Sequence, residues 1–168
     1  MRFLIVALFA ITTTAAAQQQ GPVGALKPLY QRTRELYLKS AEQMPEEHYP
    51  FKPTPDVRTF GEILGHIANE NFLFCAAALG EKNPNSTDFE KAVSKAELVK
   101  ALNAAFSYCD RAYALPDAKA MEQTALFDQK GSRLWALVFN LTHDGEHYGN
   151  LVTYFRIKGM VPPSSRGQ

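Results

Sequence analysis

The sequence is poor in several features that mark particular classes of protein. It has only two cysteines in 168 residues, too few for a disulfide-rich scaffold or for a zinc site built from cysteines alone. Neither sign of charge is in excess, because 18 Lys and Arg stand against 17 Asp and Glu. Bulk charge therefore gives no reason to expect a nucleic acid or an anionic membrane as a partner. No internal repeat is visible, and the length suits one domain.

Long hydrophobic runs are also lacking, and the one clear apolar run lies at the N-terminus. Arg2 is followed by nine apolar residues, Phe3 to Ile11, and then by a small uncharged stretch with an Ala-x-Ala site at Ala17. Nine residues rise about 14 Å as a helix, whereas crossing a membrane takes about 20 residues. We therefore predict a signal peptide over residues 1–17, export to the periplasm or the medium, and a single domain over residues 18–168.

The remaining chain has the apolar spacing of four helices. Apolar residues at three- and four-residue steps predict helices over about 25–44, 59–79, 94–115 and 132–158. Capping-box spacing marks the start of the second helix at Thr59 and of the third at Ser94. Four amphipathic helices in a small domain predict an all-α four-helix bundle. For residues 117–131 we expect a short helical turn and an irregular stretch.

The connection between the second and third helices is long, at about 13 residues. Extended, it reaches about 43 Å, more than the roughly 30 Å length of a 20-residue helix. These helices can therefore run parallel with a crossover, which would place Cys75 and Cys109 at similar heights. A disulfide forms only if the two helices are neighbours, which the sequence does not show, and we favour two buried free thiols.

Histidine is scarce, yet three of the four histidines lie in predicted helices. His143 and His147 are four residues apart, so they project from one face of the last helix. His66 lies on an apolar face of the second helix, whereas His48 lies in the Pro-rich connection before it. Two histidines from one helix and one from another predict a three-nitrogen metal site with a fourth position open for water or substrate.

Two other interpretations of these histidines compete with this prediction. A buried histidine is more often a hydrogen-bonded core residue, so three unrelated core histidines are one alternative. The segment from His143 to His147 also matches the His-x-x-Glu-His motif of a class of zinc proteases, which needs a further ligand downstream. None of the 21 residues after His147 is His, Asp, Glu or Cys. The third ligand must therefore lie upstream, where His66 is found.

Further residues of the same two helices are candidates to complete the site. Glu70 lies one turn beyond the histidine of the second helix, and Asn140 and Asn150 share the line of the two histidines in the last helix. Each of these three polar side chains either orients an imidazole or is only a polar residue whose hydrogen bonds are satisfied elsewhere. Gly145 and Gly149 lie about 200° round the helix from that line, where we expect close packing against another helix.

The sequence resembles the DinB-like superfamily from about Leu26 to Pro163. The resemblance rests on three segments, namely Arg58-Thr59-Phe60-Gly61-Glu62-Ile63-Leu64-Gly65-His66-Ile67-Ala68, the two later histidines followed by Gly149-Asn150, and the C-terminal run from Tyr154 to Pro163. It implies an up-down-down-up bundle in which His66, His143 and His147 hold a zinc or nickel ion. Characterised members are thiol-dependent, using bacillithiol or mycothiol, but these thiols are cytosolic and this chain carries an export signal.

Together these observations predict an exported metal-dependent enzyme. The metal would activate water or a thiol against a small molecule, in a reaction of the hydrolase or S-transferase type. The alternative is a helical bundle that binds a metal or small ligand without turnover, and a fourth protein ligand closing the site would favour it. As partners we expect a small-molecule substrate, with a low-molecular-weight thiol as one candidate. We expect no nucleic acid and no membrane span, and a homodimer is left open.

Overall fold

The computed structural model of the protein describes residues 21–166, so the predicted signal peptide lies outside the described residues. Four long helices make up most of the fold: α1 (Pro22–Gln43), α2 (Phe60–Leu79), α3 (Lys95–Ala112) and α5 (Arg133–Ile157). The short elements are η1 (Glu46–His48), η2 (Phe89–Lys91), α4 (Asp117–Ala120), β1 (Gln123–Leu126), β2 (Gln129–Ser132) and η3 (Pro163–Ser165). Within residues 21–166, no helix is long and apolar enough to cross a membrane.

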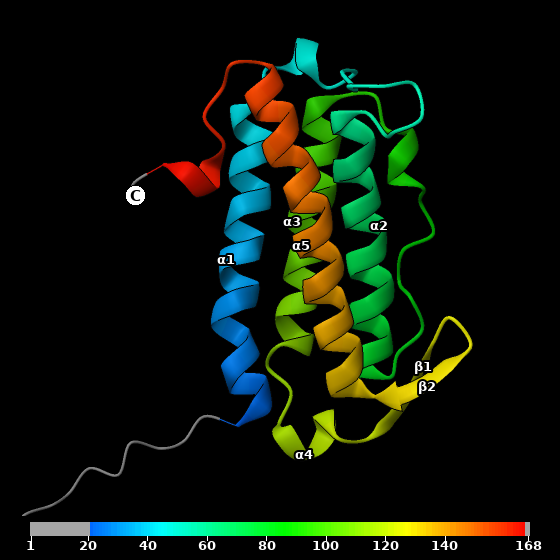
Figure 1. Ribbon diagram of the computed structural model, residues 1–168. Helices are drawn as coiled ribbons and strands as arrows, with labels where there is room; N and C mark the ends of the chain where they lie inside the picture. The colour runs from blue at the N-terminus through cyan, green and yellow to red at the C-terminus, as the bar shows by residue number, and fades with distance from the viewer. Residues whose placement is uncertain (1–20, 167–168) are drawn as a thin grey trace, which may run out of the picture.

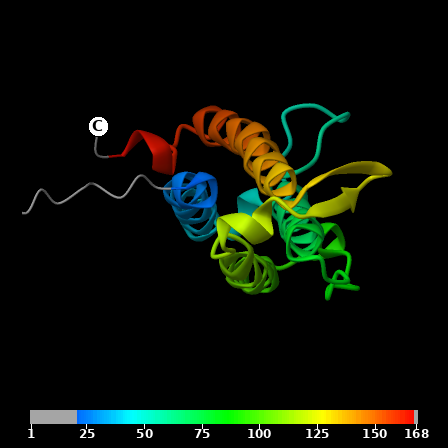
Figure 2. The same ribbon diagram turned by 90° about the horizontal axis from the view of Figure 1, so that it is seen from below.

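The four long helices form a bundle with the predicted course. α1 and α5 run in one direction, and α2 and α3 run in the other (Figure 1). Seen along its axis, the bundle is closed, because α2 packs against α3 and α5 while α1 packs against the same two helices (Figure 2). The crossover between α2 and α3 returns along the outside of the bundle and carries η2 beside α2. The all-α, up-down-down-up prediction is therefore confirmed.

The helix boundaries follow local signals in the sequence. At the start of α2, the Glu62 amide donates to the Thr59 hydroxyl at 3.1 Å, and the Thr59 amide donates to the Glu62 carboxylate at 2.6 Å. Ser94 and Ser132 cap α3 and α5 with one bond each, because their hydroxyls accept from the amides three residues on and no reciprocal side-chain bond is formed among the described residues. α2 ends at Gly80, whose φ of 70° lies in the left-handed region that favours glycine. These predicted ends are confirmed to within a residue or two.

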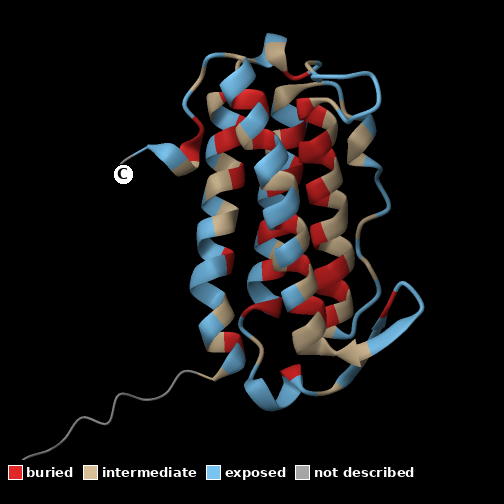
Figure 3. Cartoon of the chain, viewed as in Figure 1, coloured by how far each residue is buried: buried red, intermediate tan, exposed pale blue. Residues whose placement is uncertain are grey.

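The core is rich in aromatic rings that meet along the bundle axis. Buried residues lie on the inner faces of all four helices, as Figure 3 shows. Tyr30 stacks on Tyr113 with ring centroids 4.0 Å apart, and Phe60 meets Phe155 edge to face at 5.7 Å. Burial of each such side chain contributes about 1.5–3 kcal/mol. The contact between Phe60 and Phe155 joins α2 to α5, and these two helices carry the predicted metal ligands.

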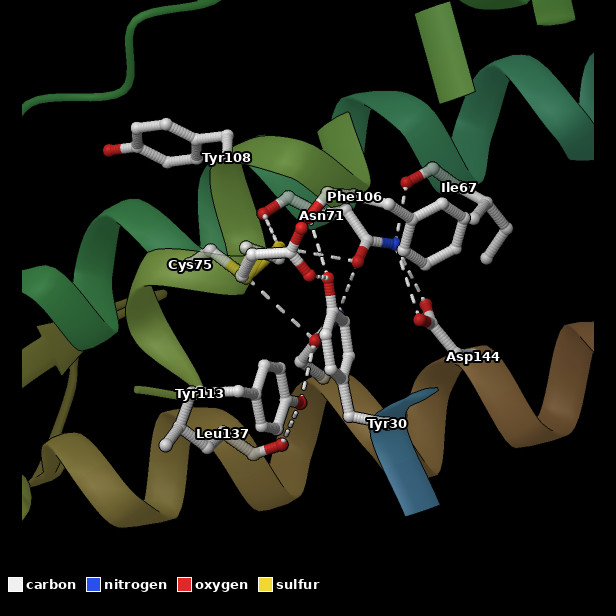
Figure 4. Close-up of a disulfide and its surroundings, with 12 residues drawn as sticks. Tyr30, Ile67, Asn71, Cys75, Phe106, Tyr108, Tyr113, Leu137 and Asp144 are labelled. Atoms are coloured by element: carbon white, nitrogen blue, oxygen red, sulfur yellow. Dashed lines mark hydrogen bonds between the residues drawn. A yellow bond between two sulfur atoms is a disulfide. The ribbon is translucent and has the colours of Figure 1, made fainter. Parts of the chain in front are cut away.

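The preference for free thiols is wrong, because Cys75 and Cys109 form a disulfide (Figure 4). α2 and α3 are parallel neighbours, and the two Cα atoms lie 5.3 Å apart, within the usual range for a disulfide. Cys75 lies 16 residues after Thr59 and Cys109 lies 15 residues after Ser94, and these similar distances from the helix starts indicate similar heights. Only the tertiary arrangement shows that the helices are adjacent.

Two further expectations are corrected. Residues 117–131 contain the expected helical turn as α4, but the stretch expected to be irregular forms most of the hairpin β1–β2. Gly145 and Gly149 do not pack against a helix, because a Cβ atom at either position would meet nothing within 4 Å. Both glycines are exposed on the solvent side of α5.

Candidate metal centre

The structure brings the three predicted histidines into one cluster between α2 and α5. One ligand atom from each of His66, His143 and His147 lies within 4.8 Å of the others. The ring centroids are 5.0 Å apart for His66 and His143, 4.8 Å for His66 and His147, and 4.6 Å for His143 and His147. All three side chains are half-buried. His48 lies apart from them, in η1.

The protonation of His66 is set by a carboxylate. Its Nδ1 lies 2.8 Å from Oε1 of Glu90, and because a carboxylate only accepts, Nδ1 carries the proton in the neutral ring. Nε2 of His66 is then an unprotonated nitrogen, and it faces Nε2 of His143 at 3.1 Å. In the metal-free chain a proton on Nε2 of His143 can bridge this gap, and a divalent ion takes the place of that proton when it binds. The donor set therefore fits a divalent ion shared by the three rings.

Electrostatics keep two of the three rings neutral. Burial lowers the pKa of His66, although the hydrogen bond to Glu90 opposes it. Burial, together with the neighbouring His143, His66 and Arg58, lowers the pKa of His147 to about 4. Histidine binds a metal only through an unprotonated nitrogen. Around neutral pH both rings are thus in the form that a metal requires.

Glu90, which the sequence did not single out, is fixed in place from two sides. Arg58 donates from Nε to Glu90 Oε2 at 2.8 Å, while His66 binds the other carboxylate oxygen. Burial opposes ionisation of Glu90, but the hydrogen bonds and the charges of Arg58 and His66 together outweigh it and lower the pKa of Glu90. Glu90 belongs to η2, which reaches α2 because Gly65 has no side chain: a Cβ atom there would clash with the carbonyl of Phe89.

A second carboxylate, also absent from the predicted site, lies behind His143. Asp144 is fully buried, and Nδ2 of Asn71 donates to its two oxygens at 3.1 and 3.2 Å. Asp144 Oδ1 lies 3.8 Å from Nδ1 of His143, too far for a hydrogen bond. That buried Nδ1 has no hydrogen-bond partner among the described residues. Burial raises the pKa of Asp144, with the His143 ring and the Asn71 amide opposing it.

Asn71 continues this polar network into the core, away from the histidines. Asn140 donates from Nδ2 to Asn71 Oδ1 at 3.2 Å and accepts from the Tyr113 hydroxyl at 2.8 Å. The sulfur of Cys109 lies 3.4 Å from the same Asn71 oxygen (Figure 4). Asn140 thus lies two hydrogen bonds from Asp144 and touches no imidazole in the described structure. Of the two alternatives for Asn140, the structure therefore favours a polar residue whose hydrogen bonds are satisfied within the core.

The two remaining candidates differ from each other in their contacts. Nδ2 of Asn150 lies 3.4 Å from Nδ1 of His147, so Asn150 is placed to orient that imidazole. Glu70 is half-buried, and its carboxylate has no hydrogen-bond partner within residues 21–166. Burial raises its pKa, and the nearby His143 opposes that shift. Glu70 is therefore a carboxylate beside the cluster that is free to exchange a proton.

A cavity of about 650 Å³ opens beside His147. It lies between the Pro-rich connection, the first turn of α2, η2 and the second half of α5, and its polar lining includes Arg58, Glu90 and Asn150. The ligand cluster in the described part of the chain holds the three histidines and no fourth residue. The site therefore combines three nitrogen ligands with space for a small molecule.

Comparisons with known proteins agree with this picture. The DinB superfamily model matches residues 29–151, and no curated protein matches the chain. A solved DinB-like protein from Bacillus cereus ATCC 10987 superposes with a TM-score of 0.70 at 17% identity, over 83% of this chain and 94% of the other. A DinB-like protein from Bacillus subtilis gives a TM-score of 0.63 at 20% identity, over 82% and 93%. Because the family model covers most of the sequence and the fold agrees, this chain belongs to the DinB superfamily.

Proposed function

We propose that the protein is an exported metal-dependent enzyme acting on a small molecule. The observation that carries the proposal is the 3.1 Å approach of two Nε2 atoms, one of them left unprotonated by Glu90, in a cluster that adjoins a cavity. When bound, a divalent ion acts as a Lewis acid and lowers the pKa of a bound water or thiol. Zinc and nickel both suit three imidazole nitrogens.

Each residue around the site has a separate task in this proposal. His66, His143 and His147 hold the ion, and Glu90 fixes the tautomer and orientation of His66. Glu70 accepts the proton released by the nucleophile and returns it to the leaving group, because it is half-buried, unbonded within the described chain and raised in pKa. A reaction of either the hydrolase or the S-transferase type would use these same metal ligands and carboxylates.

Export is also part of the proposal, and the disulfide supports it. Disulfides persist in oxidising compartments such as the periplasm and the extracellular space. Cys75 and Cys109 are joined, which agrees with the signal peptide predicted from the sequence. Cytosolic thiols such as bacillithiol would be scarce there, so water is the favoured nucleophile.

Metal content is the most direct test of the ligand set. Elemental analysis should find about one zinc or nickel per chain in the wild type, and a large loss in His143→Ala. Glu146→Gln is a matched control, because Glu146 is an exposed residue of the same helix outside the cluster. Equal metal content in wild type and His143→Ala would overturn the proposal.

Turnover separates the enzyme from a bundle that only binds a ligand. Glu70→Gln should keep the metal but lose activity against a panel of esters, amides and lactones, since the amide cannot accept a proton. A wild type that binds metal and turns over none of the panel, with or without an added thiol, would favour the non-catalytic alternative.

A further inference from the structure

The hairpin β1–β2 ends in a turn that is costly for its residues. Strands β1 and β2 pair from Gln123–Ser132 to Leu126–Gln129, which leaves Phe127 and Asp128 as a two-residue loop. Their φ angles are 49° and 60°, both in the left-handed region. Turns of this type favour Asn-Gly, and a bulky side chain in this region is a true outlier. A phenylalanine therefore lies at the tip of the hairpin in a backbone conformation that is strained for this residue.

The ring of Phe127 is not buried in return for this strain. It stays 58% exposed, although it meets Phe74 of α2 edge to face at 5.8 Å and Phe139 of α5 at 6.1 Å. Phe74 and Phe139 also meet each other, at 5.1 Å. We call these three rings, from two helices and the hairpin, the aromatic wall.

The aromatic wall is continuous with the metal centre. Phe74 meets His143 edge to face, with ring centroids 5.1 Å apart, and Phe139 precedes His143 by one turn of α5. Along α2, the cavity residue Glu62 lies one turn before His66, and Phe74 lies two turns after it. The hairpin stands beside the lower half of α2 and α5 (Figures 1 and 2). The metal centre therefore has a mixed-polarity cavity at one end and aromatic rings at the other.

We propose that the aromatic wall binds an aryl or similarly flat apolar group of the small molecule that the metal centre receives. Strained residues concentrate at functional sites, and an exposed ring held by other rings offers a face for stacking. A protein partner would need about 800 Å² of matching surface on this side. The exposed part of the wall is mainly the Phe127 ring, since Phe74 is only 1% exposed and Phe139 is half-buried. This inference rests on the proposed function and specifies its substrate class.

The test compares two hydroxamates that differ only in an aromatic ring. The full-length protein is loaded with Co²⁺, and its visible absorption is followed during titration with acetohydroxamate and benzohydroxamate. The dissociation constants are measured for wild type, Phe127→Asn and Phe127→Tyr. Asn tolerates the left-handed turn but lacks the ring, whereas Tyr keeps the ring.

The wild type and Phe127→Tyr should bind benzohydroxamate roughly threefold to tenfold more tightly than Phe127→Asn does. Acetohydroxamate affinity and cobalt content should be equal in all three proteins. The thermal midpoint of Phe127→Asn should stay the same or rise, because the turn strain is relieved, whereas a ring needed for stability would lower it.

The outcomes keep the two proposals distinct. If acetohydroxamate binds but removal of the Phe127 ring leaves benzohydroxamate affinity unchanged, the aromatic wall is not the aryl site, while the open metal centre stands. That result would mean that the exposed Phe127 ring contacts a macromolecular partner or binds no ligand. If cobalt is retained and neither hydroxamate binds the wild type, the metal position is closed, and both proposals fail.

Discussion

Glu90 lies 24 residues beyond His66 in the sequence, yet its carboxylate accepts a hydrogen bond from Nδ1 of that histidine at 2.8 Å. Glu90→Gln removes the negative charge that stabilises the Nδ1–H tautomer of the ligand. Loss of such an outer carboxylate typically costs 10–100-fold in metal affinity. We expect a loss of about tenfold or more for this variant, measured by competition with a chromophoric zinc chelator.

Glu146→Gln is the control for charge alone, because it also removes one carboxylate from the neighbourhood of the histidines but from an exposed position. Its zinc affinity should match that of the wild type. An equal loss of affinity in both variants would indicate a general charge effect and would remove the specific role of Glu90.

A pair of Gly→Ala variants tests how η2 is held against α2. A Cβ atom at Gly65 would clash with the carbonyl of Phe89, whereas one at Gly145 would meet nothing. Gly65→Ala should lower the free energy of unfolding by about 1–3 kcal/mol. It should also weaken metal binding, because Glu90 moves with Phe89.

Gly145→Ala should instead raise the free energy of unfolding by about 0.5–1 kcal/mol, since alanine favours an exposed helix interior. Both values come from urea unfolding of chelator-treated protein. If both variants changed the free energy of unfolding in the same direction, the conclusion that η2 approaches α2 closely at Gly65 would be wrong.

The parts that the sequence predicts are those with a local signal. Capping residues Thr59, Ser94 and Ser132 marked the helix starts within a residue or two, because a cap bonds to the amide three positions on. The His143 and His147 pair was recognisable because four residues make about one helical turn. These features depend on neighbours in sequence.

The parts that were missed depend on which segments meet in space. Glu90 reaches His66 only through the path of the crossover, and the disulfide needs α2 and α3 to be adjacent. The hairpin was missed for a different reason: Phe127-Asp128 lacks the Asn-Gly or Asp-Gly signal of a two-residue turn. Local chemistry disfavours that turn, so no local pattern could indicate it.

The disulfide should be a large contributor to stability. Cys75 and Cys109 are separated by 34 residues, and closing a loop of that size in the unfolded chain is worth about 3–4 kcal/mol in the chain-entropy model. The double variant Cys75→Ala/Cys109→Ala should lose roughly this free energy of unfolding in urea. Its zinc content should stay near that of the wild type, because the sulfurs contact Asn71 and not a histidine.

Reduction provides the control for this loss. Wild type unfolded and refolded under dithiothreitol should approach the stability of the double variant, while dithiothreitol should leave the double variant unchanged. A wild type whose urea midpoint is the same with and without the reductant would show that the bridge contributes little, or that it does not form.

The metal-free protein should lose stability as the pH falls below neutral, and His147 should account for part of that loss. Its pKa is lowered to about 4 in the folded chain, against about 6.5 in an unfolded one. Between these values the unfolded chain binds a proton that the folded chain does not. The free energy of unfolding therefore decreases as the pH is lowered. The penalty begins near pH 6.5 and is complete below about pH 4.

His147→Gln removes this titration and isolates its share. The difference in free energy of unfolding between pH 7 and pH 5, taken on chelator-treated protein, should be smaller in His147→Gln than in the wild type. His48→Gln is the matched control, since His48 lies in η1 away from the cluster, and its pH dependence should follow the wild type. An unchanged slope in His147→Gln would mean that His147 is not held in its neutral form by burial and by the neighbouring imidazoles. The argument that His147 offers an unprotonated nitrogen to a metal near neutral pH would then lose its electrostatic support.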